Sequence, residues 1–335
     1  MSADSNTAMR RLGLVLTDGD GNPRWPPLIV LRLHRGGRSI TVDTMQIGAI
    51  GTYLFVVIGT AAGIWWFWTV GLTWFDAVLF IVSTFIVGLG ITLGYHRLYS
   101  HRAFETSPGI AVTLGILGAA ALQGQILVWT SIHRKHHHHP DQDGDPHSPK
   151  PKVAGVRAAM SAFVDGHVGR VFSGRFYCYL PYIRDLRKDR SIGFVDRSYW
   201  IWALLGLLLP GLIGTAWHGG WEGFVSGLFA GGILRAFFHL NTTWAVNSLG
   251  HLFGRRPFAT KDDSTNNVLV NVLSMNGEGL HNNHHAFPWS ARFALFRGEI
   301  DPGYLILCLL ARLGLVWNIK TPSKKLIASR AISNA

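Results

Sequence analysis

The sequence predicts an all-α membrane protein with four transmembrane helices in two hairpins and a cytoplasmic helical cap that holds a histidine-rich metal site. Three observations predict this fold. Of the 335 residues, 48% are hydrophobic and only 15% are charged, a smaller charged share than soluble domains have. The apolar residues form blocks long enough to cross a bilayer. Histidines at helical spacing follow these blocks or lie between them.

The basic residues are unevenly distributed, and their distribution predicts the orientation. The net charge is +12; residues 1–45 carry six Lys or Arg, residues 133–198 carry twelve and residues 255–330 carry ten. The short connections at 70–75 and 217–222 carry none. This asymmetry follows the positive-inside rule. We therefore expect both termini and the metal site in the cytoplasm, with the basic faces against anionic lipid headgroups rather than nucleic acid.

Residues 1–45 are polar and form the predicted cytoplasmic arm of a membrane domain that covers residues 46–325. Residues 46–70 and, after a short break, 75–95 are each long and apolar enough to span a bilayer. So short a connection forces the two spans into a hairpin, whose second helix ends at His96. Tryptophans crowd the tip of the hairpin, as in the aromatic belts of membrane proteins: Trp65, Trp66, Trp68 and Trp74.

The segment 109–129 is also apolar, but we expect it to be buried in the protein or re-entrant. A full crossing would place His96 and His133, which flank it, on opposite faces of the membrane. The segment contains Gln123 and Gln125, and these amides suit a protein environment better than lipid.

The second hairpin separates two parts of the cap. Residues 133–198 are polar and basic and form the first part. Predicted spans at 199–216 and 221–240 follow, joined by a short connection. Residues 247–325 form the second part of the cap, and residues 326–335 form a C-terminal tail.

A few polar and small residues lie inside the predicted spans. Thr84, Gly88 and Thr92 form a stripe at a spacing of four, which we interpret as a tight helix contact rather than a ligand groove. Arg235 and His239 lie near the inner end of the last span, where they can snorkel or face a polar cavity. For His239 a hydrogen-bonded structural role is an equal alternative.

Nine histidines in four places form the candidate metal site. Histidines at i, i+3 and i+4 of a helix direct three imidazoles at one point, and this spacing occurs twice. Two more histidines follow the second span, and another follows the fourth span, four residues after an asparagine. The set is His96, His101, His133, His136, His137, His251, His281, His284 and His285, with Asn247 beside it.

The number of these histidines predicts a two-metal centre, because a single four-coordinate zinc site cannot use nine ligands. Carboxylate-bridged di-iron bundles use two Glu-x-x-His motifs, and only one such motif, Glu278-Gly-Leu-His281, occurs at these clusters. An all-imidazole ligand set adds no negative charge and favours reduced ferrous ions, but general metal affinities favour copper or zinc, so the residues leave the metal open. We expect interleaved carboxylates and amides to fix the ring tautomers: Asp141, Asp145, Glu278, Asn282 and Asn283.

The histidine clusters resemble those of the integral-membrane fatty acyl desaturases, which introduce cis double bonds into acyl chains. The resemblance covers roughly residues 45–325, and residues 287–292 look most like the plant and cyanobacterial acyl-lipid branch. The matching runs are Gly94-Tyr-His-Arg-Leu-Tyr-Ser-His101, Trp129-Thr-Ser-Ile-His-Arg-Lys-His-His137 with Asp145-Pro-His-Ser148, Trp244-Ala-Val-Asn-Ser-Leu-Gly-His251 and Gly277-Glu-Gly-Leu-His-Asn-Asn-His-His285.

This resemblance implies a reaction, a cofactor and a substrate site. It implies that the nine histidines bind two Fe²⁺ ions, that Asn247 reaches one iron through water, and that O2 is the co-substrate. No catalytic residue is implied beyond these ligands. The resemblance also implies a bent acyl tunnel lined by Gln123, Trp129 and Thr243, and a double bond at the delta-9 position.

The acyl carrier and the electron donor are less defined. The animal acyl-CoA branch has an Arg-Asp pair before the second histidine box, where this chain has Ser131 and Ile132. The carrier of the fatty acyl substrate therefore stays open between CoA, acyl-carrier protein and a glycerolipid ester. The sequence has no cytochrome b5-like or nicotinamide-binding segment, so we expect an external donor such as ferredoxin or cytochrome b5.

Two alternatives remain at this stage. The first is a membrane di-iron hydroxylase that acts on an alkane, a sterol or a carotenoid. The second is not an enzyme but a metal transporter or sensor, which the scarcity of polar residues in the spans disfavours.

Overall fold

The computed structural model describes residues 14–17, 23–35, 38–142, 144–146, 155–172 and 178–332, with side chains from residue 46 on, except that of residue 170. The chain is mostly helical, as predicted. Within the described residues, four helices are long and apolar enough to cross a membrane, which confirms the predicted number: Gln46–Val70, Trp74–Ser100, Tyr199–His218 and Gly220–Leu252.

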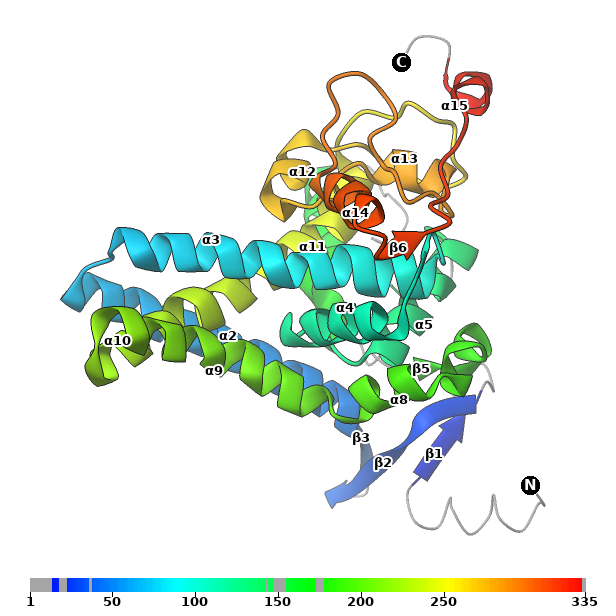
Figure 1. Ribbon diagram of the computed structural model, residues 1–335. Coiled ribbons are helices and arrows are strands. Elements are labelled where there is room, and N and C mark those ends of the chain that lie inside the picture. The colour runs from blue at the N-terminus through cyan, green and yellow to red at the C-terminus, as the bar shows by residue number, and fades with distance from the viewer. Residues whose placement is uncertain are drawn as a thin grey trace.

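The four long helices form the two predicted hairpins. The first consists of α2 (Thr44–Val70) and α3 (Trp74–Leu89), which continues as the π-helix η1 (Gly90–Ser100). The second consists of α9 (Tyr199–His218) and α10 (Gly220–Gly227), which continues through the π-helix η5 (Leu228–Leu234) into α11 (Arg235–Leu252). Figure 1 shows the tips of both hairpins at the same end of the molecule, with the cap towards the other end.

The second hairpin is held together by close backbone contact. A Cβ atom at Gly214 would lie 2.2 Å from the carbonyl oxygen of Gly223, and one at Gly227 would lie 2.2 Å from that of Pro210. Only glycine permits this approach, which is a common way for membrane helices to pack. At the tips, the rings of Trp74 and Trp217 lie 5.4 Å apart, so the tryptophans of the two hairpins meet.

The segment 109–129 does not form one continuous helix. It contains α4 (Pro108–Ala120) and the start of α5 (Ile126–His138). Between them Leu122 and Gly124 adopt positive φ angles of 59° and 99°, which break the helix. The helix α4 packs against η1 so closely that a Cβ atom at Gly90 would lie 2.2 Å from the amide nitrogen of Gly118. Its position relative to a bilayer stays a prediction.

Short helices and strands complete the cap. Before the second hairpin these are α6 (Val156–Val164), η2 (Asp165–Gly169), α7 (Arg170–Phe172), η3 (Leu180–Ile183), η4 (Leu186–Lys188) and α8 (Arg190–Arg197). After it come α12 (Val268–Ser274), α13 (His281–Ala286), α14 (Pro302–Arg312) and α15 (Lys324–Arg330). Figure 1 shows these last four helices gathered on one side of α3.

The arm before α2 contains three strands that the sequence did not predict. They are β1 (Leu14–Thr17), β2 (Pro23–Arg35) and β3 (Arg38–Asp43), and they form an antiparallel sheet in which β5 (Cys178–Tyr179) also pairs with β2. A second small sheet joins β4 (Glu105–Thr106) to β6 (Val316–Trp317).

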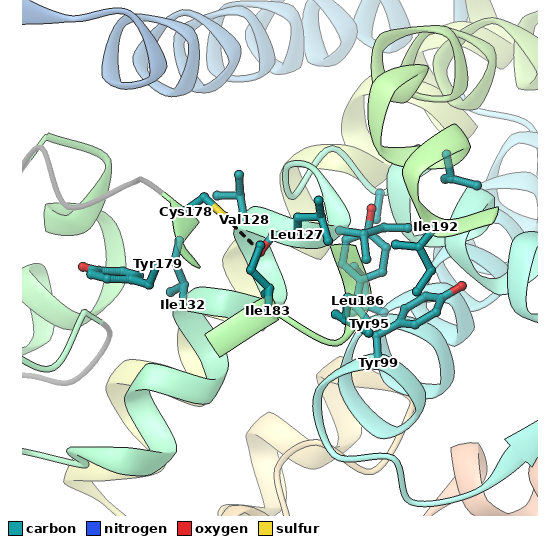
Figure 2. Close-up of a cluster of buried hydrophobic side chains, with 14 of the residues drawn as sticks. Tyr95, Tyr99, Leu127, Val128, Ile132, Cys178, Tyr179, Ile183, Leu186 and Ile192 are labelled. Atoms are coloured by element: carbon teal, nitrogen blue, oxygen red, sulfur yellow. Dashed lines mark hydrogen bonds between the residues drawn. The ribbon is translucent and has the colours of Figure 1, made fainter. Parts of the chain in front are cut away.

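An apolar core fixes the position of α5, the helix with the polyhistidine run. Figure 2 shows Tyr95 and Tyr99 of η1 together with Leu127 of α5 and apolar residues of the segment 178–192. The buried thiol of Cys178 donates to the carbonyl oxygen of Leu127 at 3.7 Å. Two histidine-bearing helices, η1 and α5, therefore share one core with the first part of the cap.

A buried ion pair attaches the C-terminal part of the cap to η1. The guanidinium of Arg97 lies 2.8 Å from a carboxylate oxygen of Asp301, and both side chains are almost completely buried. Asp301 also accepts hydrogen bonds from the backbone amides of Phe293 and Tyr304, the second of which caps α14. The carboxylate of Asp301 thus joins three segments at one point. One of them is η1 at Arg97, the residue that follows His96.

We expect Asp301→Ala to lower the free energy of unfolding by about 3–5 kcal/mol, because it leaves the buried charge of Arg97 without its partner. Denaturant unfolding of the purified protein in detergent measures this loss. The matched control is Asp263→Ala, since Asp263 pairs with Arg256 in an exposed position and should contribute no more than about 1 kcal/mol. Equal losses in the two variants would contradict the structural role of the Arg97–Asp301 pair.

Candidate metal centre

The π-helix η1 brings the first two candidate histidines to the same side. His96 lies within η1 and His101 directly follows it. The amide of His101 donates to the carbonyl oxygen of His96, five residues earlier, at 3.1 Å. In a regular α-helix residues five apart point in different directions, whereas the wider π turn places them on one face. The rings of the two histidines are 5.0 Å apart.

The two i, i+3, i+4 clusters lie on short helices, as the spacing predicted. His133, His136 and His137 lie on α5, and His281, His284 and His285 lie on α13. His251 comes from the last turn of α11. All nine candidate histidines therefore come from the ends of long helices or from short helices of the cap.

The structure brings the nine histidines together in two groups. Within each group, one candidate ligand atom from every residue lies within 4.8 Å of the others. The first group is His96, His101, His133, His137 and His284. The second group is His136, His251, His281 and His285.

The imidazoles meet through their Nε2 atoms. In the first group, Nε2 of His284 lies 3.0 Å from that of His96 and 2.9 Å from that of His137. In the second group, the Nε2 atoms of His251 and His281 are 3.0 Å apart. Those of His136 and His285 are 3.3 Å apart. The Nε2 atoms of His101 and His133 are 2.8 Å apart, so all nine nitrogens point inward.

Carboxylates hold the outer nitrogens of four rings. Nδ1 of His136 lies 2.9 Å from Asp145, and Nδ1 of His251 lies 3.1 Å from Asp141. Nδ1 of His285 lies 3.0 Å from Asp262, and Nδ1 of His96 lies 2.7 Å from Glu278, which also accepts from the hydroxyl of Thr92. A carboxylate at Nδ1 fixes the tautomer that leaves a lone pair on Nε2.

This arrangement fits a bound metal ion. His136 and His285 each direct Nδ1 at a carboxylate, so two neutral rings would turn their Nε2 lone pairs toward each other, and a metal ion bound by both nitrogens would remove this repulsion. Burial opposes a proton on His136, but the neighbouring carboxylates, first of all Asp145, raise its pKa. A proton is disfavoured in the first group, since burial lowers the pKa of His137 and His284 well below the usual value. Burial likewise lowers the pKa of His285, to about 4. Neutral imidazole is the form that binds metals.

The prediction of the outer carboxylates and amides was partly wrong. Asp141, Asp145 and Glu278 contact histidines as predicted. The amide of Asn282 instead binds the backbone of Phe258, and that of Asn283 binds Glu299 and Asn266. These two asparagines hold the loops around α13 in place.

Sequence reasoning missed Asp262, the partner of His285. This carboxylate is buried, and the amide and hydroxyl groups of the same loop also donate to it. Its contact with His285, reinforced by Ser264, lowers the pKa of Asp262 although burial alone would raise it. Asp262 lies 23 residues before His285, so no helical spacing connects the two.

A small cavity, partly open to solvent, lies against both histidine groups. Its lining includes His96 and His133 of the first group and His281 of the second. Asn247 lines the same cavity. A substrate in this cavity would lie next to the inward-facing histidine nitrogens.

The three predicted tunnel residues form one hydrogen-bonded chain beside this cavity. The indole of Trp129 donates to Gln123 at 3.1 Å, and the amide of Gln123 donates to the hydroxyl of Thr243 at 2.7 Å. Trp129 and Thr243 line the cavity. The ring of Trp129 stacks on His133 with a centroid distance of 5.0 Å.

The interpretation of the stripe at Thr84, Gly88 and Thr92 as a helix contact was wrong for two of its members. Gly88 lines the cavity, and Thr92 binds Glu278 behind His96. Only Thr84 bonds within its own helix, to the carbonyl oxygen of Phe80. Gly88 therefore belongs to the cavity wall and Thr92 to the groups behind the histidines, while Thr84 stays within its helix.

The fold and the site define an integral membrane protein with a histidine-rich cluster whose geometry is compatible with metal binding. Residues 72–295 match the sequence model of the family described as fatty acid desaturase. The chain belongs to this family, and it is a fatty acid desaturase in the broad sense of the family name.

The chain is similar to relatives whose names give different acyl carriers. It is 34% identical to the hex-5-enoyl-(acyl-carrier protein) acetylenase of Moorena producens (strain JHB) over 88% of this chain and 94% of the relative. It is 38% identical to the sn-1 stearoyl-lipid 9-desaturase of Anabaena variabilis over 71% of this chain and 81% of the relative. It is 28% identical to the stearoyl-CoA desaturase 5 of Homo sapiens over 96% and 91% of the two chains.

We expect His136→Ala to lower the metal content of the purified protein, because His136 donates one of four nitrogens in the second group. Elemental analysis measures the metal-to-protein ratio, and membrane fractionation shows whether insertion is intact. His138→Ala is the matched control, since His138 lies on the same helix, is exposed and contacts Tyr182 instead. An unchanged metal content in His136→Ala would refute its assignment as a ligand.

We expect Asp262→Asn to weaken metal binding by about 10–100-fold, as the loss of a carboxylate behind a histidine ligand generally does. Competition with a metal chelator measures the change. The control is Asp263→Asn, which alters the neighbouring, half-exposed carboxylate. If both variants retained the metal equally well, Asp262 would have only a structural role.

Proposed function

We propose that the protein is an O2-dependent desaturase that introduces a cis double bond, at the delta-9 position, into a saturated acyl chain. The observation that carries this proposal is the cavity that touches both histidine groups and also Trp129 and Thr243. Most of the exposed wall of this cavity is apolar, as an acyl chain requires, although many lining residues also carry polar groups. Relatives named as 9-desaturases support the position of the double bond.

The proposed cofactor is a pair of Fe²⁺ ions, which the nine histidines would hold, with Asn247 of the same cavity as a further, indirect ligand. When reduced by an external donor such as ferredoxin or cytochrome b5, the ions would supply, with O2, the oxidising power needed to attack an unactivated methylene. The reaction takes two hydrogens from the acyl chain and consumes O2, two electrons and two protons, with two molecules of water as the other product.

The protein positions the acyl chain and keeps it dry. The hydrogen bonds from Trp129 to Gln123 and from Gln123 to Thr243 fix the cavity wall next to His133. A fixed wall holds one bend of the acyl chain against the histidine groups, and so selects which two methylenes react. The surrounding histidines are deeply buried, and an acyl chain that fills the cavity would exclude water from the reacting carbons.

The carrier that we propose is a glycerolipid or acyl-carrier protein rather than CoA. Ser131 and Ile132 occupy the positions where the acyl-CoA branch has its Arg-Asp pair, and both are buried. The hydroxyl of Ser131 donates to the carbonyl oxygen of Val128 and accepts from the amide of Tyr179. Neither residue is available to contact a charged headgroup.

We also propose that the cap and both termini lie in the cytoplasm. The loops at the two hairpin tips carry no Lys or Arg, whereas the cap is rich in both. Exposed tryptophans at the tips, such as Trp68 and Trp221, suit the opposite membrane interface. Residues 1–13 and 333–335 lie outside the described residues, so the position of the termini rests on the charge distribution.

Membership in the desaturase family decides between the enzyme and the metal transporter or sensor in favour of the enzyme. The hydroxylase of an alkane, sterol or carotenoid stays the alternative reaction. The similarity to an acetylenase adds a triple bond as another outcome.

We expect a host that expresses the chain to accumulate acyl chains with one cis double bond at carbon 9. Gas chromatography and mass spectrometry of fatty acid methyl esters, with the glycerolipid, acyl-carrier protein and CoA pools separated first, measure the product and its carrier. The His136→Ala variant should lack the product and serves as the control. An alcohol or an alkyne in place of the alkene would overturn the proposed reaction, and a product that appears first in the CoA pool would overturn the proposed carrier.

A further inference from the structure

The cavity next to the histidine groups contains two buried polar side chains with unused hydrogen-bonding atoms. His239 is only 4% exposed and Asn276 only 2%. Among the described residues, neither ring nitrogen of His239 has a hydrogen-bond partner, and neither has Oδ1 of Asn276. Both side chains line the cavity. Buried polar groups normally have partners, so these atoms indicate that a ligand completes the site.

The two side chains lie around one point of the cavity wall. A Cβ atom built on Gly88 would lie 2.1 Å from Nδ2 of Asn276 and 3.5 Å from Cε1 of His239. Gly88 thus leaves room for both groups. The next positions of the lining in this region, Thr242 and Ser274, are also polar. We call His239 and Asn276 the polar pair.

The unused atoms are not a general property of buried polar groups in this membrane span. Arg235, one turn before His239 on α11, is completely buried, but its guanidinium donates to three backbone carbonyls, of Gly231, Ala120 and Gly206. An ionisable side chain inside a span that lacks such partners generally marks a functional site. Arg235 therefore has a structural role, and His239 remains available to a ligand.

The donors and acceptors of the polar pair define the group that it can bind. Nδ2 of Asn276 donates to the carbonyl oxygen of Ser274 at 3.0 Å, which orients the amide and leaves Oδ1 as an acceptor. A neutral imidazole adds one donor and one acceptor. A carbonyl or ether oxygen only accepts and would leave the acceptors unused. A hydroxyl group both donates and accepts, so it matches the pair.

We propose that the polar pair binds a hydroxyl group on the acyl chain, so that the preferred substrates of this enzyme are hydroxylated acyl chains. The proposal rests on the proposed function, which assigns the cavity to the acyl chain. His239, Thr243 and Asn247 follow each other at intervals of four on one face of α11 and all line the cavity. The hydroxyl site therefore lies two helical turns, about 12 Å, from the level of Asn247. The hydroxyl of a preferred substrate should therefore lie at a defined distance along the acyl chain from the reacting carbons.

The first test measures binding without catalysis. Methyl stearate and a series of methyl hydroxystearates, with the hydroxyl at different positions, are added to the purified protein in detergent, and the shift in Tm is compared. We expect one position, or two adjacent ones, to bind at least about tenfold more tightly than methyl stearate, because the polar pair is unsatisfied without a hydroxyl. If no isomer stabilises the protein more than methyl stearate, the polar pair holds a water molecule only and the proposal fails.

Variants test whether the preference arises from the polar pair. It should disappear in His239→Leu, and His239→Gln, which keeps a donor and an acceptor, should retain it. The matched control is His167→Leu, since His167 is paired with Ser248 and Asn241 outside the cavity lining. Loss of the preference in the control as well, or its persistence in both His239→Leu and Asn276→Leu, would overturn the assignment to the polar pair.

The second test measures the reaction. Cells that express the chain receive equal amounts of stearate and the preferred hydroxystearate, and the ratio of the two desaturated products is measured. We expect the ratio to favour the hydroxylated product by at least about tenfold. A ratio near one would contradict the proposal. Absence of both products would instead count against the proposed desaturase function, while the Tm comparison would still decide whether the hydroxyl site exists.

Discussion

The structure depends on the close approach of nine imidazole rings whose inner nitrogens face one another. Such a cluster repels itself when it is protonated and loses solvation when it is buried, so it cannot form from local preferences alone. The carboxylates at Nδ1 of four rings stabilise it, because they fix the tautomer and partly compensate the charge of a bound cation. The inner nitrogens add no negative charge, as expected, and the negative charge lies on the carboxylates behind them, of which Asp141, Asp145 and Glu278 were predicted.

The cap provides the rigid support that these carboxylates need. Asp141 accepts from the backbone amide of Asp263, so one carboxylate joins the loops before and after the second hairpin. Glu299 binds the amides of Asn266 and Asn283 and so holds α13 against the preceding loop. These polar residues of the cap therefore hold its segments together, and they do so through hydrogen bonds. This explains why so polar a region is buried.

The histidines and the spans could be predicted because both signals are local. The i, i+3, i+4 spacing places three rings on one helix face whatever surrounds the helix, and an apolar block longer than a bilayer is thick has few alternatives. The π turn that aligns His96 with His101, the contact between Asp262 and His285, and the place of Gly88 in the cavity wall depend on segments far apart in sequence. Neither spacing nor composition specifies such contacts.

Buried polar groups inside and beside the membrane spans are of two kinds, those with hydrogen-bond partners and those without. Arg235 donates to backbone carbonyls, and Gln123 binds the hydroxyl of Thr243 and the indole of Trp129. Both residues connect separate segments, and a ligand would have to break these hydrogen bonds to bind them. His239 lies one turn from Arg235. Its burial also costs solvation free energy, but no hydrogen bond from its ring nitrogens to another described residue offsets that cost. A bound group that forms hydrogen bonds with such a side chain would offset the loss of solvation. The substrate specificity of the enzyme should therefore be sought at the unsatisfied groups of the cavity and not at the satisfied ones.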